Sequence, residues 1–229
     1  MESNSIRKTE MHKKSNVTSM DEYVKSHTLQ QFWDEIIHVE NSVWPVGFQS
    51  SVDVFKSRMN VFPQGFMIAE KEGTVKGFTT SQILNYDPEI KKTWYEITDH
   101  GNLVKTHIPS GDSLYVVSIS VAPEFQGQGI GTQLIEAQKD LVRRLGLKRL
   151  FLGARIPGYD EYCKKNGEIS AEKYVALKDK GEIFIDPEVR FYNRYGLQPK
   201  TIIPNYEPDV PSRDYGIVMV WENPQSARV

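Results

Sequence analysis

The spacing of apolar residues in the first third of the chain predicts two helices followed by a pair of strands. Apolar side chains recur at helical spacing over residues 23–44, and again over the shorter segment 52–61. A turn at residues 63–65 separates these helices from an apolar strand at residues 66–69, whose hairpin partner is expected at residues 75–80. Helices and strands therefore share one part of the chain, which is typical of α/β and α+β domains.

The most regular pattern lies in the middle of the chain. Residues 114–121 are rich in Tyr, Val and Ile, which predicts a buried strand. Simple alternation places three aliphatic side chains on one face of this strand and two serines on the other face: Val117, Ile119 and Val121 against Ser118 and Ser120. Helical spacing follows over residues 129–145, and a short buried strand is expected at residues 150–152. This order of strand, loop, helix and strand is a βαβ unit.

Two irregular segments and a polar tail are also expected. Residues 86–112 mix Pro, Asp, Lys and aromatic side chains, and we interpret them as an insertion that forms a small hairpin over the active site. A second insertion is expected at residues 153–185, where Ser170 can cap a helix that ends at Gly181. Both insertions are predicted to build a specificity pocket, because loops on a rigid scaffold usually do so. Residues 1–20 are predicted to be a mobile polar tail, with room for one edge strand.

The last part of the chain returns to a regular order. Asp186 and the proline after it supply a cap and a first-turn proline for a helix that extends to Tyr195. Strands are expected at residues 201–203 and 215–221. No repeat or linker interrupts the pattern, so residues 21–229 are predicted to form a single domain.

Composition limits the partners of such a domain. Hydrophobic residues make up 39% of the chain and charged residues 25%, which suffices for a buried core. The formal net charge of −2 gives no basic field, so nucleic acid and membrane surfaces are not expected partners. The chain has one cysteine, no apolar signal segment and no run long enough to span a bilayer, which favours a cytoplasmic protein. Its histidines do not have the spacing of metal ligands, so no metal is expected.

A glycine-rich loop leads into the central helix. It carries three glycines in five residues and reads Gln126, Gly127, Gln128, Gly129, Ile130, Gly131 and Thr132. Backbone N–H groups at a helix start have no partner within the helix, and the helix dipole adds partial positive charge, so such a loop binds phosphate oxygens. Glycines also remove the Cβ atoms that would keep a phosphate away from the backbone. The alternative, a tight turn between strand and helix, needs only one glycine.

Comparison with known phosphate-loop patterns limits the kinds of ligand that this loop could bind. The dinucleotide fingerprint fails because Thr132 stands at its third glycine, and the nucleoside-triphosphate loop fails because no Gly-Lys-Ser/Thr sequence follows. The region resembles the GNAT superfamily of acyl-CoA N-acyltransferases in two pieces of sequence, Val121-Ala122-Pro123 and Gln126-x-x-Gly129-x-Gly131. The resemblance implies a single domain with a mixed, mostly antiparallel central sheet that is splayed at the CoA site and flanked by helices.

The same resemblance implies how the co-substrate binds. Acetyl-CoA would place its pyrophosphate on Gln126 and on the backbone amides of residues 127–132. Its pantetheine arm would pair like an added strand with the backbone of Ile119 and Val121, on either side of Ser120. No metal ion takes part in this scheme.

A second stretch resembles the family's segment Phe-Tyr-x-x-x-Gly-Phe, and it runs from Phe191 to Leu197. In the family this tyrosine commonly protonates the departing CoA thiolate, which makes Tyr192 the candidate general acid. Tyr195 lies one helical turn away and is the rival. The alternative is that both are core aromatics with satisfied hydroxyl groups.

A narrower resemblance covers residues 155–221. This region is similar to the acetyltransferase domain fused to a carbon–nitrogen hydrolase domain in some bacterial proteins. The matching pieces are Arg155-Ile156-Pro157-Gly158-Tyr159, the Ser170 helix, Asp186-Pro187, Asn205-Tyr206 and Ser212-Arg213-Asp214-Tyr215-Gly216 with Trp221. Some polyketide loading modules carry related domains that decarboxylate an acyl-CoA and load a carrier protein. Those domains have a histidine where this chain has Tyr192, which argues against decarboxylation here.

Together these patterns predict an N-acetyltransferase that moves an acetyl group from acetyl-CoA to a primary amine of a small molecule or peptide by direct attack. The amine must lose a proton before it attacks. The strand at residues 114–121 offers no acidic residue as a base, and Asp112, Glu96 or His107 could act through water. Two other functions stay open, a decarboxylating or carrier-loading acyltransferase and a non-catalytic acyl-CoA-binding module, and so does a homodimer.

Overall fold

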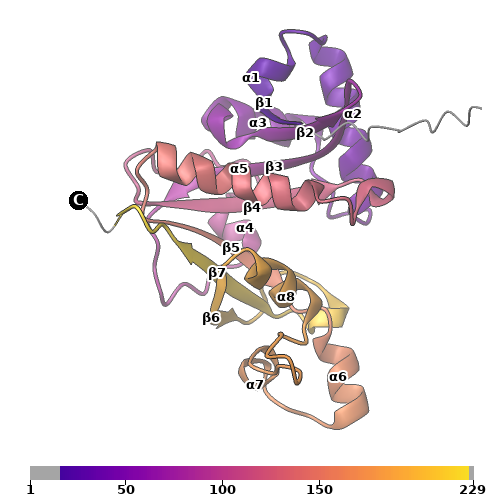
Figure 1. Ribbon diagram of the computed structural model, residues 1–229, viewed down its shortest axis with the longest axis vertical. Coiled ribbons are helices and arrows are strands. Elements are labelled where there is room, and N and C mark those ends of the chain that lie inside the picture. Colours follow the sequence, from indigo (N-terminus) through magenta and orange to yellow (C-terminus); the bar gives the residue numbers. More distant parts are fainter. Residues whose placement is uncertain (1–15, 227–229) are drawn as a thin grey trace, which may run out of the picture.

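The computed structural model describes residues 16–226, which form one domain around a seven-stranded sheet (Figure 1). The strand order is β1-β2-β3-β4-β5-β7-β6, and of the described neighbouring pairs only β4 and β5 run parallel. The strands are β1 (Asn16–Ser19), β2 (Met67–Lys71), β3 (Thr74–Leu84), β4 (Ser113–Val121), β5 (Arg149–Arg155), β6 (Gln198–Ile203) and β7 (Gly216–Glu222). The predicted mixed, mostly antiparallel sheet is confirmed.

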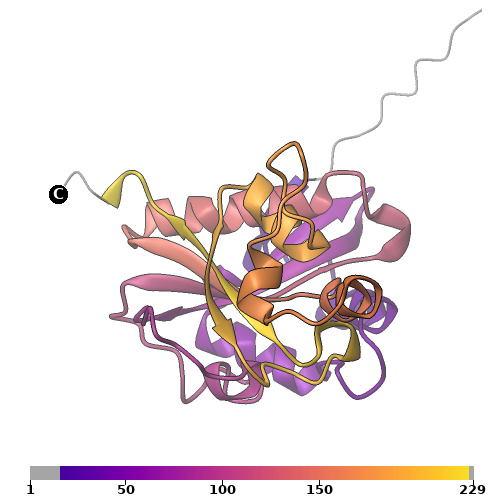
Figure 2. The ribbon, with the colours of Figure 1, turned by 90° about the horizontal axis from the view of Figure 1, so that it is seen from below.

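Helices cover both faces of this sheet. They are α1 (Met20–Tyr23), α2 (Leu29–Val43), α3 (Val52–Val61), α4 (Trp94–Ile97), α5 (Ile130–Arg144), α6 (Tyr159–Asn166), α7 (Ala171–Val175) and α8 (Pro187–Arg194). Apolar side chains of α5 and α8 share one core with β4 and β5. Those of α2 and α3 pack on β2 and β3 in a second core. Viewed from below, the segment from α6 to α8 lies on the side of the domain where β6 and β7 are found (Figure 2).

β4 and β5 pair over only three residues before they diverge. Residues 113–115 pair with residues 149–151, and beyond them the described pairs of β4 are with β3 alone. A register shift opposite Thr80 and Ser81 leaves Val117 as an extra residue in β4, which is a β-bulge. Bulges are frequent beside active sites, where they redirect the strand. The sheet therefore opens between β4 and β5, as the predicted splay requires.

The bulge also changes the faces of β4. Val117 packs with Tyr115 and Phe151 in the cluster that contains α4, whereas Ile119 and Val121 pack toward α5. The prediction that all three aliphatic residues share one face was wrong for Val117. The reason is that an extra residue at a bulge shifts the alternation of side chains by one position.

Several predicted elements have different limits in the structure. The helix expected over residues 23–44 is interrupted, because the side chain of Thr28 caps the start of α2. Residues 86–112 contain the short α4 and turns instead of a hairpin, and a capping box formed by Thr93 and Glu96 begins α4.

The second insertion was predicted only in part. Ser170 caps α7 as expected, but the helix ends at Val175 and not at Gly181. Asp179 explains the early end, because its carboxylate accepts hydrogen bonds from the backbone N–H groups of Gly181 and Ile183 and so folds a turn there. Helix α6, which precedes α7, was not predicted.

The predicted tail at residues 1–20 lies mostly outside the described residues. Within the described part, Asn16–Ser19 form β1 at one edge of the sheet, antiparallel to β2, and Met20 is buried at the start of α1. The edge strand allowed for in the sequence is therefore present. None of the helices between residues 16 and 226 combines the length and apolar character needed to cross a membrane.

Candidate active site

The glycine loop joins the end of β4 to the start of α5. After a short 3₁₀ helix at Pro123–Phe125, the side-chain amide of Gln126 donates a hydrogen bond to the backbone carbonyl of Val121 (3.0 Å) and holds the loop against the strand. Gly127 and Gly129 adopt φ angles of 72° and 84°, in the left-handed region that favours glycine. Gly129 is the N-cap of α5, and no side chain caps this helix start.

The geometry of this loop fits a phosphate group. Residues 126–129 are exposed, and a Cβ atom added at Gly127 or Gly129 would meet no atom within 4 Å. The first turn of α5 contains no acidic residue that would repel an anion. The Nζ atom of Lys71 lies 3.5 Å from the side-chain oxygen of Gln128 and adds positive charge beside the loop. Uncapped N–H groups, helix dipole and a nearby cation together favour an anion here.

Three other predicted site residues have contacts within the protein: Ser120, Gly131 and Thr132. A Cβ on Gly131 would lie 3.3 Å from an aromatic ring of α8, so this glycine permits the approach of α5 and α8. The hydroxyl groups of Thr132 and Tyr195 are hydrogen-bonded at 2.6 Å. The Ser120 hydroxyl is buried and accepts a hydrogen bond from the indole N–H of Trp44 (3.0 Å). Any contact of Ser120 or Gly131 with a ligand is thus left to the backbone.

A cavity of about 370 Å³ lies where β4 and β5 separate. Its polar and aromatic walls come from separate parts of the chain and include Glu40, Trp44, Arg58, Trp94, Tyr95, Ser118, Arg155, Glu188, Tyr192, Tyr206 and Glu207. Tyr192 thus lines the cavity, whereas the hydroxyl of its rival Tyr195 is bonded to Thr132. Of the predicted insertions, the first contributes Trp94 and Tyr95, but the second reaches the cavity only through Gly153 and Arg155.

A buried network of charges and hydroxyl groups forms one wall of this cavity. Arg58 of α3 is only 2% exposed and donates hydrogen bonds to the hydroxyl groups of Ser50 (3.0 Å), Thr80 and Ser118 (3.3 Å each). Glu40 of α2 accepts a hydrogen bond from the backbone N–H of Ser50 (2.8 Å). Burial lowers the pKa of Arg58 to about 10 and raises the pKa of Glu40, while the attraction between the two opposes both shifts.

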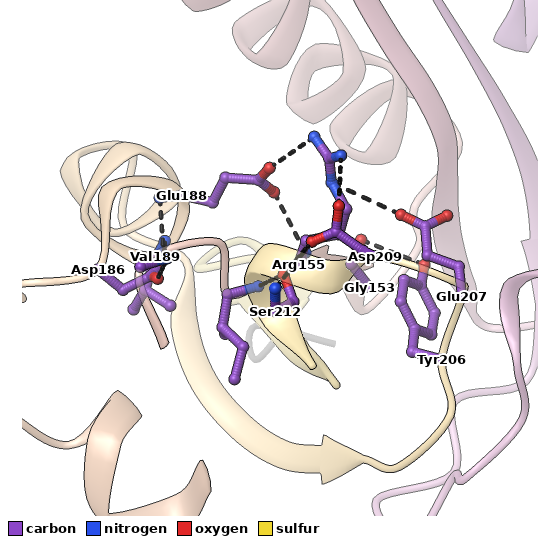
Figure 3. Close-up of polar contacts among 11 residues, drawn as sticks. Gly153, Arg155, Asp186, Glu188, Val189, Tyr206, Glu207, Asp209 and Ser212 are labelled. Carbon is purple, nitrogen blue, oxygen red and sulfur yellow. Dashed lines mark hydrogen bonds and ion pairs between the residues drawn. The ribbon is translucent and has the colours of Figure 1, made fainter. Parts of the chain in front are cut away.

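A second charged cluster surrounds Arg155 at the end of β5 (Figure 3). The Arg155 guanidinium contacts the carboxylates of Glu188 (2.9 Å), Glu207 (3.5 Å) and Asp209 (3.5 Å), and it lies over the ring of Trp44 at 5.3 Å. The Arg155 backbone N–H also donates to Glu188 (3.1 Å). One cation shared by three carboxylates leaves an excess of negative charge when all are ionised, which suits a cationic ligand.

Burial sets the proton affinities in this cluster. It raises the pKa of Glu188 to about 7, although the positive charge of Arg155 opposes the shift. Burial likewise raises the pKa of Glu207 against the effect of Arg155. The pKa of Tyr192 is raised by burial and further by the negative charge of Glu188, so this phenol keeps its proton at neutral pH. The cavity therefore places a protonated phenol beside carboxylates of raised pKa.

The raised pKa of Glu188 predicts a pH-dependent stability. A carboxyl group whose pKa is higher in the folded chain favours folding fully below its unfolded pKa of 4.5, and this contribution is lost as the pH rises through about 7. Relative to the wild type, Glu188→Gln should therefore gain stability between about pH 5 and about pH 8, by roughly 3 kcal/mol at most. Urea unfolding at both pH values measures this gain. A stability difference that does not change with pH would contradict it.

The proton acceptors considered in the sequence lie elsewhere. Asp112 forms an ion pair with Lys148 (3.2 Å) at the start of β4, Glu96 caps α4, and His107 stacks on Phe62 at 5.0 Å. None of the three lines the cavity. Among residues 16–226, no group of three or more His, Cys, Asp or Glu side chains is arranged to hold a metal ion.

None of the five charged residues that line the cavity was predicted as a site residue: Glu40, Arg58, Arg155, Glu188 and Glu207. Glu40 and Arg58 occupy core-facing positions of their helices, and a charge in an apolar stripe is a signal that could have identified them. Glu188 precedes Tyr192 by four residues, which places both on one helix face. Arg155 gave no comparable signal, because it ends a strand. The alternation of side chains along a strand does not show which distant residues will contact Arg155.

Comparison with known proteins assigns the chain to a family. The profile of the "Acetyltransferase (GNAT) family" matches residues 32–160, more than half of the chain. The chain belongs to the GNAT acetyltransferase family. This GNAT protein is accordingly an acyltransferase, and the resemblance inferred from the glycine loop is confirmed.

Two relatives from Bacillus subtilis (strain 168) match this GNAT protein at 35% identity. The "Uncharacterized N-acetyltransferase YkwB" aligns over 195 residues, which cover 83% of this chain and 84% of YkwB. The "Probable hydrolase YhcX" aligns over 192 residues, which cover 83% of this chain but only 36% of YhcX. The chain thus spans about a third of YhcX, which agrees with a resemblance to an acetyltransferase domain joined to a hydrolase.

Solved structures share the fold at lower identity. The loading GNATL domain of CurA from Lyngbya majuscula has a TM-score of 0.75 at 21% identity and covers 92% of this chain and 98% of that domain. The GphF GNAT-like decarboxylase in complex with isobutyryl-CoA has a TM-score of 0.73 at 22% identity, with 91% and 99% covered. The ribosomal-protein-S18-alanine N-acetyltransferase from Escherichia coli has a TM-score of 0.52 at 17% identity, with 91% and 93% covered. These likenesses show a common fold.

Proposed function

We propose that this GNAT protein transfers an acetyl group from acetyl-CoA to a primary amine by direct attack. The observation that carries the proposal is the continuity of the site. An uncapped glycine loop that fits a phosphate group joins the open edge of β4, and that edge leads into a cavity lined by Tyr192. A long CoA thioester needs a site of this order, with an anion site at one end and a proton donor at the other.

The chain's own groups would share the binding of acetyl-CoA. The backbone N–H groups of residues 127–132 would hold the pyrophosphate, with Gln126 bracing the loop against β4. The backbone of Ile119 and Val121 would pair with the pantetheine arm, because β4 has no described partner on the side of β5 at these positions. This arrangement would place the thioester near Tyr192, whose hydroxyl would protonate the sulfur as the C–S bond breaks.

The acceptor would be an amine of a small molecule or peptide that enters the cavity from the side of α4. Carboxylates around Arg155 favour its ammonium form during binding, and the aromatic side chains Trp44, Trp94 and Tyr95 provide apolar walls. Acetyl transfer then requires the nitrogen to lose its proton, since only the free amine has a lone pair for attack.

Tyr95 provides a test of this acceptor side. We expect Tyr95→Ala to raise the KM of the amine by about tenfold, the equivalent of about 1.4 kcal/mol, because an aromatic wall is removed. The acetyl-CoA dissociation constant should stay unchanged, since Tyr95 lines the cavity and residues 126–132 of the glycine loop do not. Steady-state kinetics and calorimetry measure the two effects. A weaker affinity for acetyl-CoA with an unchanged amine KM would show that Tyr95 contacts acetyl-CoA and not the acceptor amine.

A second candidate function comes from the structural neighbours. The GNATL domain of CurA and the GphF decarboxylase match this fold with higher TM-scores than the Escherichia coli N-acetyltransferase. The experiment that separates the functions offers acetyl-CoA with a panel of primary amines, and in parallel malonyl-CoA alone. Thiol release that depends on an amine supports acetyl transfer. Carbon dioxide from malonyl-CoA without an amine supports decarboxylation.

A further inference from the structure

Helix α8 presents two groups capable of proton transfer to the same cavity. Glu188 lies in its first turn and Tyr192 one turn later, and both side chains line the cavity. Residues four apart lie on one face of a helix. We propose that Glu188 is the general base that takes the proton from the acceptor amine, so that one helix face carries both the base and the acid. This inference rests on the proposed acetyl transfer.

The contacts of Glu188 hold its carboxylate in place without using up its oxygens. One oxygen accepts a hydrogen bond from the Arg155 guanidinium (2.9 Å), and the other accepts one from the Arg155 backbone N–H (3.1 Å) (Figure 3). Each carboxylate oxygen has a second lone pair, which can accept a proton. The side chain is 25% exposed, and its residue lines the cavity, so an acceptor can reach it.

The charges around Glu188 suit a base that works near neutral pH. Arg155 would lower its pKa strongly in a one-to-one pair, but Glu207 and Asp209 share that guanidinium. Asp186, at the N-cap of α8, adds negative charge, and the facing phenol of Tyr192 is neutral. Burial raises the pKa of Glu188 most, Arg155 lowers it and Asp186 raises it further, and the resulting pKa of about 7 is close to the value that general base catalysis favours at neutral pH.

The other carboxylates of the cavity are less suited to this role. Glu40 is only 3% exposed, whereas the Glu188 side chain is 25% exposed, so an acceptor reaches Glu188 more readily. Glu207 lines the cavity and also contacts Arg155, but it belongs to the segment after β6 and not to the helix of Tyr192. Glu207 is therefore the rival that the experiment must compare with Glu188.

The step balances with these two groups. An N–H bond of the acceptor ammonium breaks and its proton passes to Glu188, while the electron pair stays on nitrogen. That pair forms the new C–N bond with the thioester carbonyl carbon, the C–S bond breaks, and Tyr192 gives its proton to the sulfur. A second nitrogen proton is lost as the amide forms. One of the two nitrogen protons restores Tyr192, and the other leaves to solvent, so each turnover yields amide, CoA thiol and one proton.

The test is the pH dependence of kcat/KM for the wild type and for Glu188→Gln, with acetyl-CoA and an alkyl primary amine that the wild type acetylates. We expect the wild-type profile to rise through a pKa near 7, and Glu188→Gln to lose this rise and about 10²–10⁴-fold in kcat. A limb near the amine's own pKa of about 10 should remain in both. Glu188→Asp should keep part of the activity and the rise near pH 7. Unchanged acetyl-CoA affinity by calorimetry verifies that the variants are folded.

Two further variants make the assignment specific. Asp209→Asn removes a competitor for Arg155 outside the cavity, so the rise should move to lower pH as Arg155 pairs more closely with Glu188. The inference is overturned if Glu188→Gln keeps its rate within about threefold and keeps the rise near pH 7, or if Glu207→Gln alone abolishes both. If the wild type acetylates no amine of the panel, the proposed acetyl transfer is wrong, and so is the role of Glu188 as its general base.

Discussion

Replacing Tyr192 by phenylalanine is expected to lower kcat by about 10²–10⁴-fold, the usual contribution of a general acid. Only the hydroxyl group is lost, and the ring keeps its packing in the core formed by α5 and α8. Because Tyr192 lines the cavity and the substitution removes only its hydroxyl group, the acetyl-CoA dissociation constant should stay nearly unchanged. Steady-state kinetics with calorimetry on the same preparation measures both quantities.

Tyr195→Phe is the matched control for this prediction. It removes a phenol from the same helix end, but one whose hydroxyl is bonded to Thr132. We expect a modest loss of stability, of about 1 kcal/mol, and a nearly normal kcat. If Tyr195→Phe abolishes turnover and Tyr192→Phe does not, the general acid lies one helical turn from its proposed place. A loss below about threefold in Tyr192→Phe would mean that water or another group protonates the thiolate.

Gly129→Val should weaken acetyl-CoA binding by about tenfold to a hundredfold, which corresponds to the loss of one hydrogen bond to a charged group. A branched side chain at the N-cap of α5 would stand in space that is open in the structure and that the proposed pyrophosphate site requires. Valine also strains a backbone with a φ of 84°. Calorimetric titration with acetyl-CoA measures the affinity, and thermal unfolding measures the strain.

Gly146→Val separates the two effects. Gly146 also has a left-handed φ, of 65°, and a Cβ there would meet no atom within 4 Å, but it follows the opposite end of α5. Its variant should therefore lose comparable stability and keep its affinity for acetyl-CoA. Gly129→Ala serves as the milder variant, since alanine tolerates this backbone better than a branched residue. Equal affinities for acetyl-CoA in all three variants and the wild type would show that the pyrophosphate site is misplaced.

The sequence predicted the elements that depend on local interactions. The end of β4, the glycine loop and α5 follow from alternation, glycine content and helical spacing within one short segment. The limits of α3 were predicted for the same reason. The family could be inferred because the loop needs particular residues at fixed spacing, and such spacing survives in a single sequence.

The parts that were not predicted depend on distant segments. The bulge at Val117 arises from the register between β4 and β3, which alternation along one strand does not specify. Arg155 at the end of β5 pairs with Gly216 at the start of β7, and the segment that joins β6 to β7 brings Glu207 to Arg155, although the two are 52 positions apart in sequence. Single residues also decided local limits, as where the Asp179 turn ended α7 early. Charge pairs and turns of this kind become visible only once the topology is known.

The most direct test of the central claim is the product balance of a single reaction mixture. The protein is incubated with acetyl-CoA and the panel of primary amines, and mass spectrometry quantifies acetylated amine while thiol titration quantifies released CoA. Acetyl transfer predicts equal amounts of acetylated amine and CoA thiol, and the proposed role of Tyr192 predicts that Tyr192→Phe forms both products about 10²–10⁴-fold more slowly at the same protein concentration. Bound acetyl-CoA without amine acetylation, or thiol release with no acetylated amine, would contradict the account.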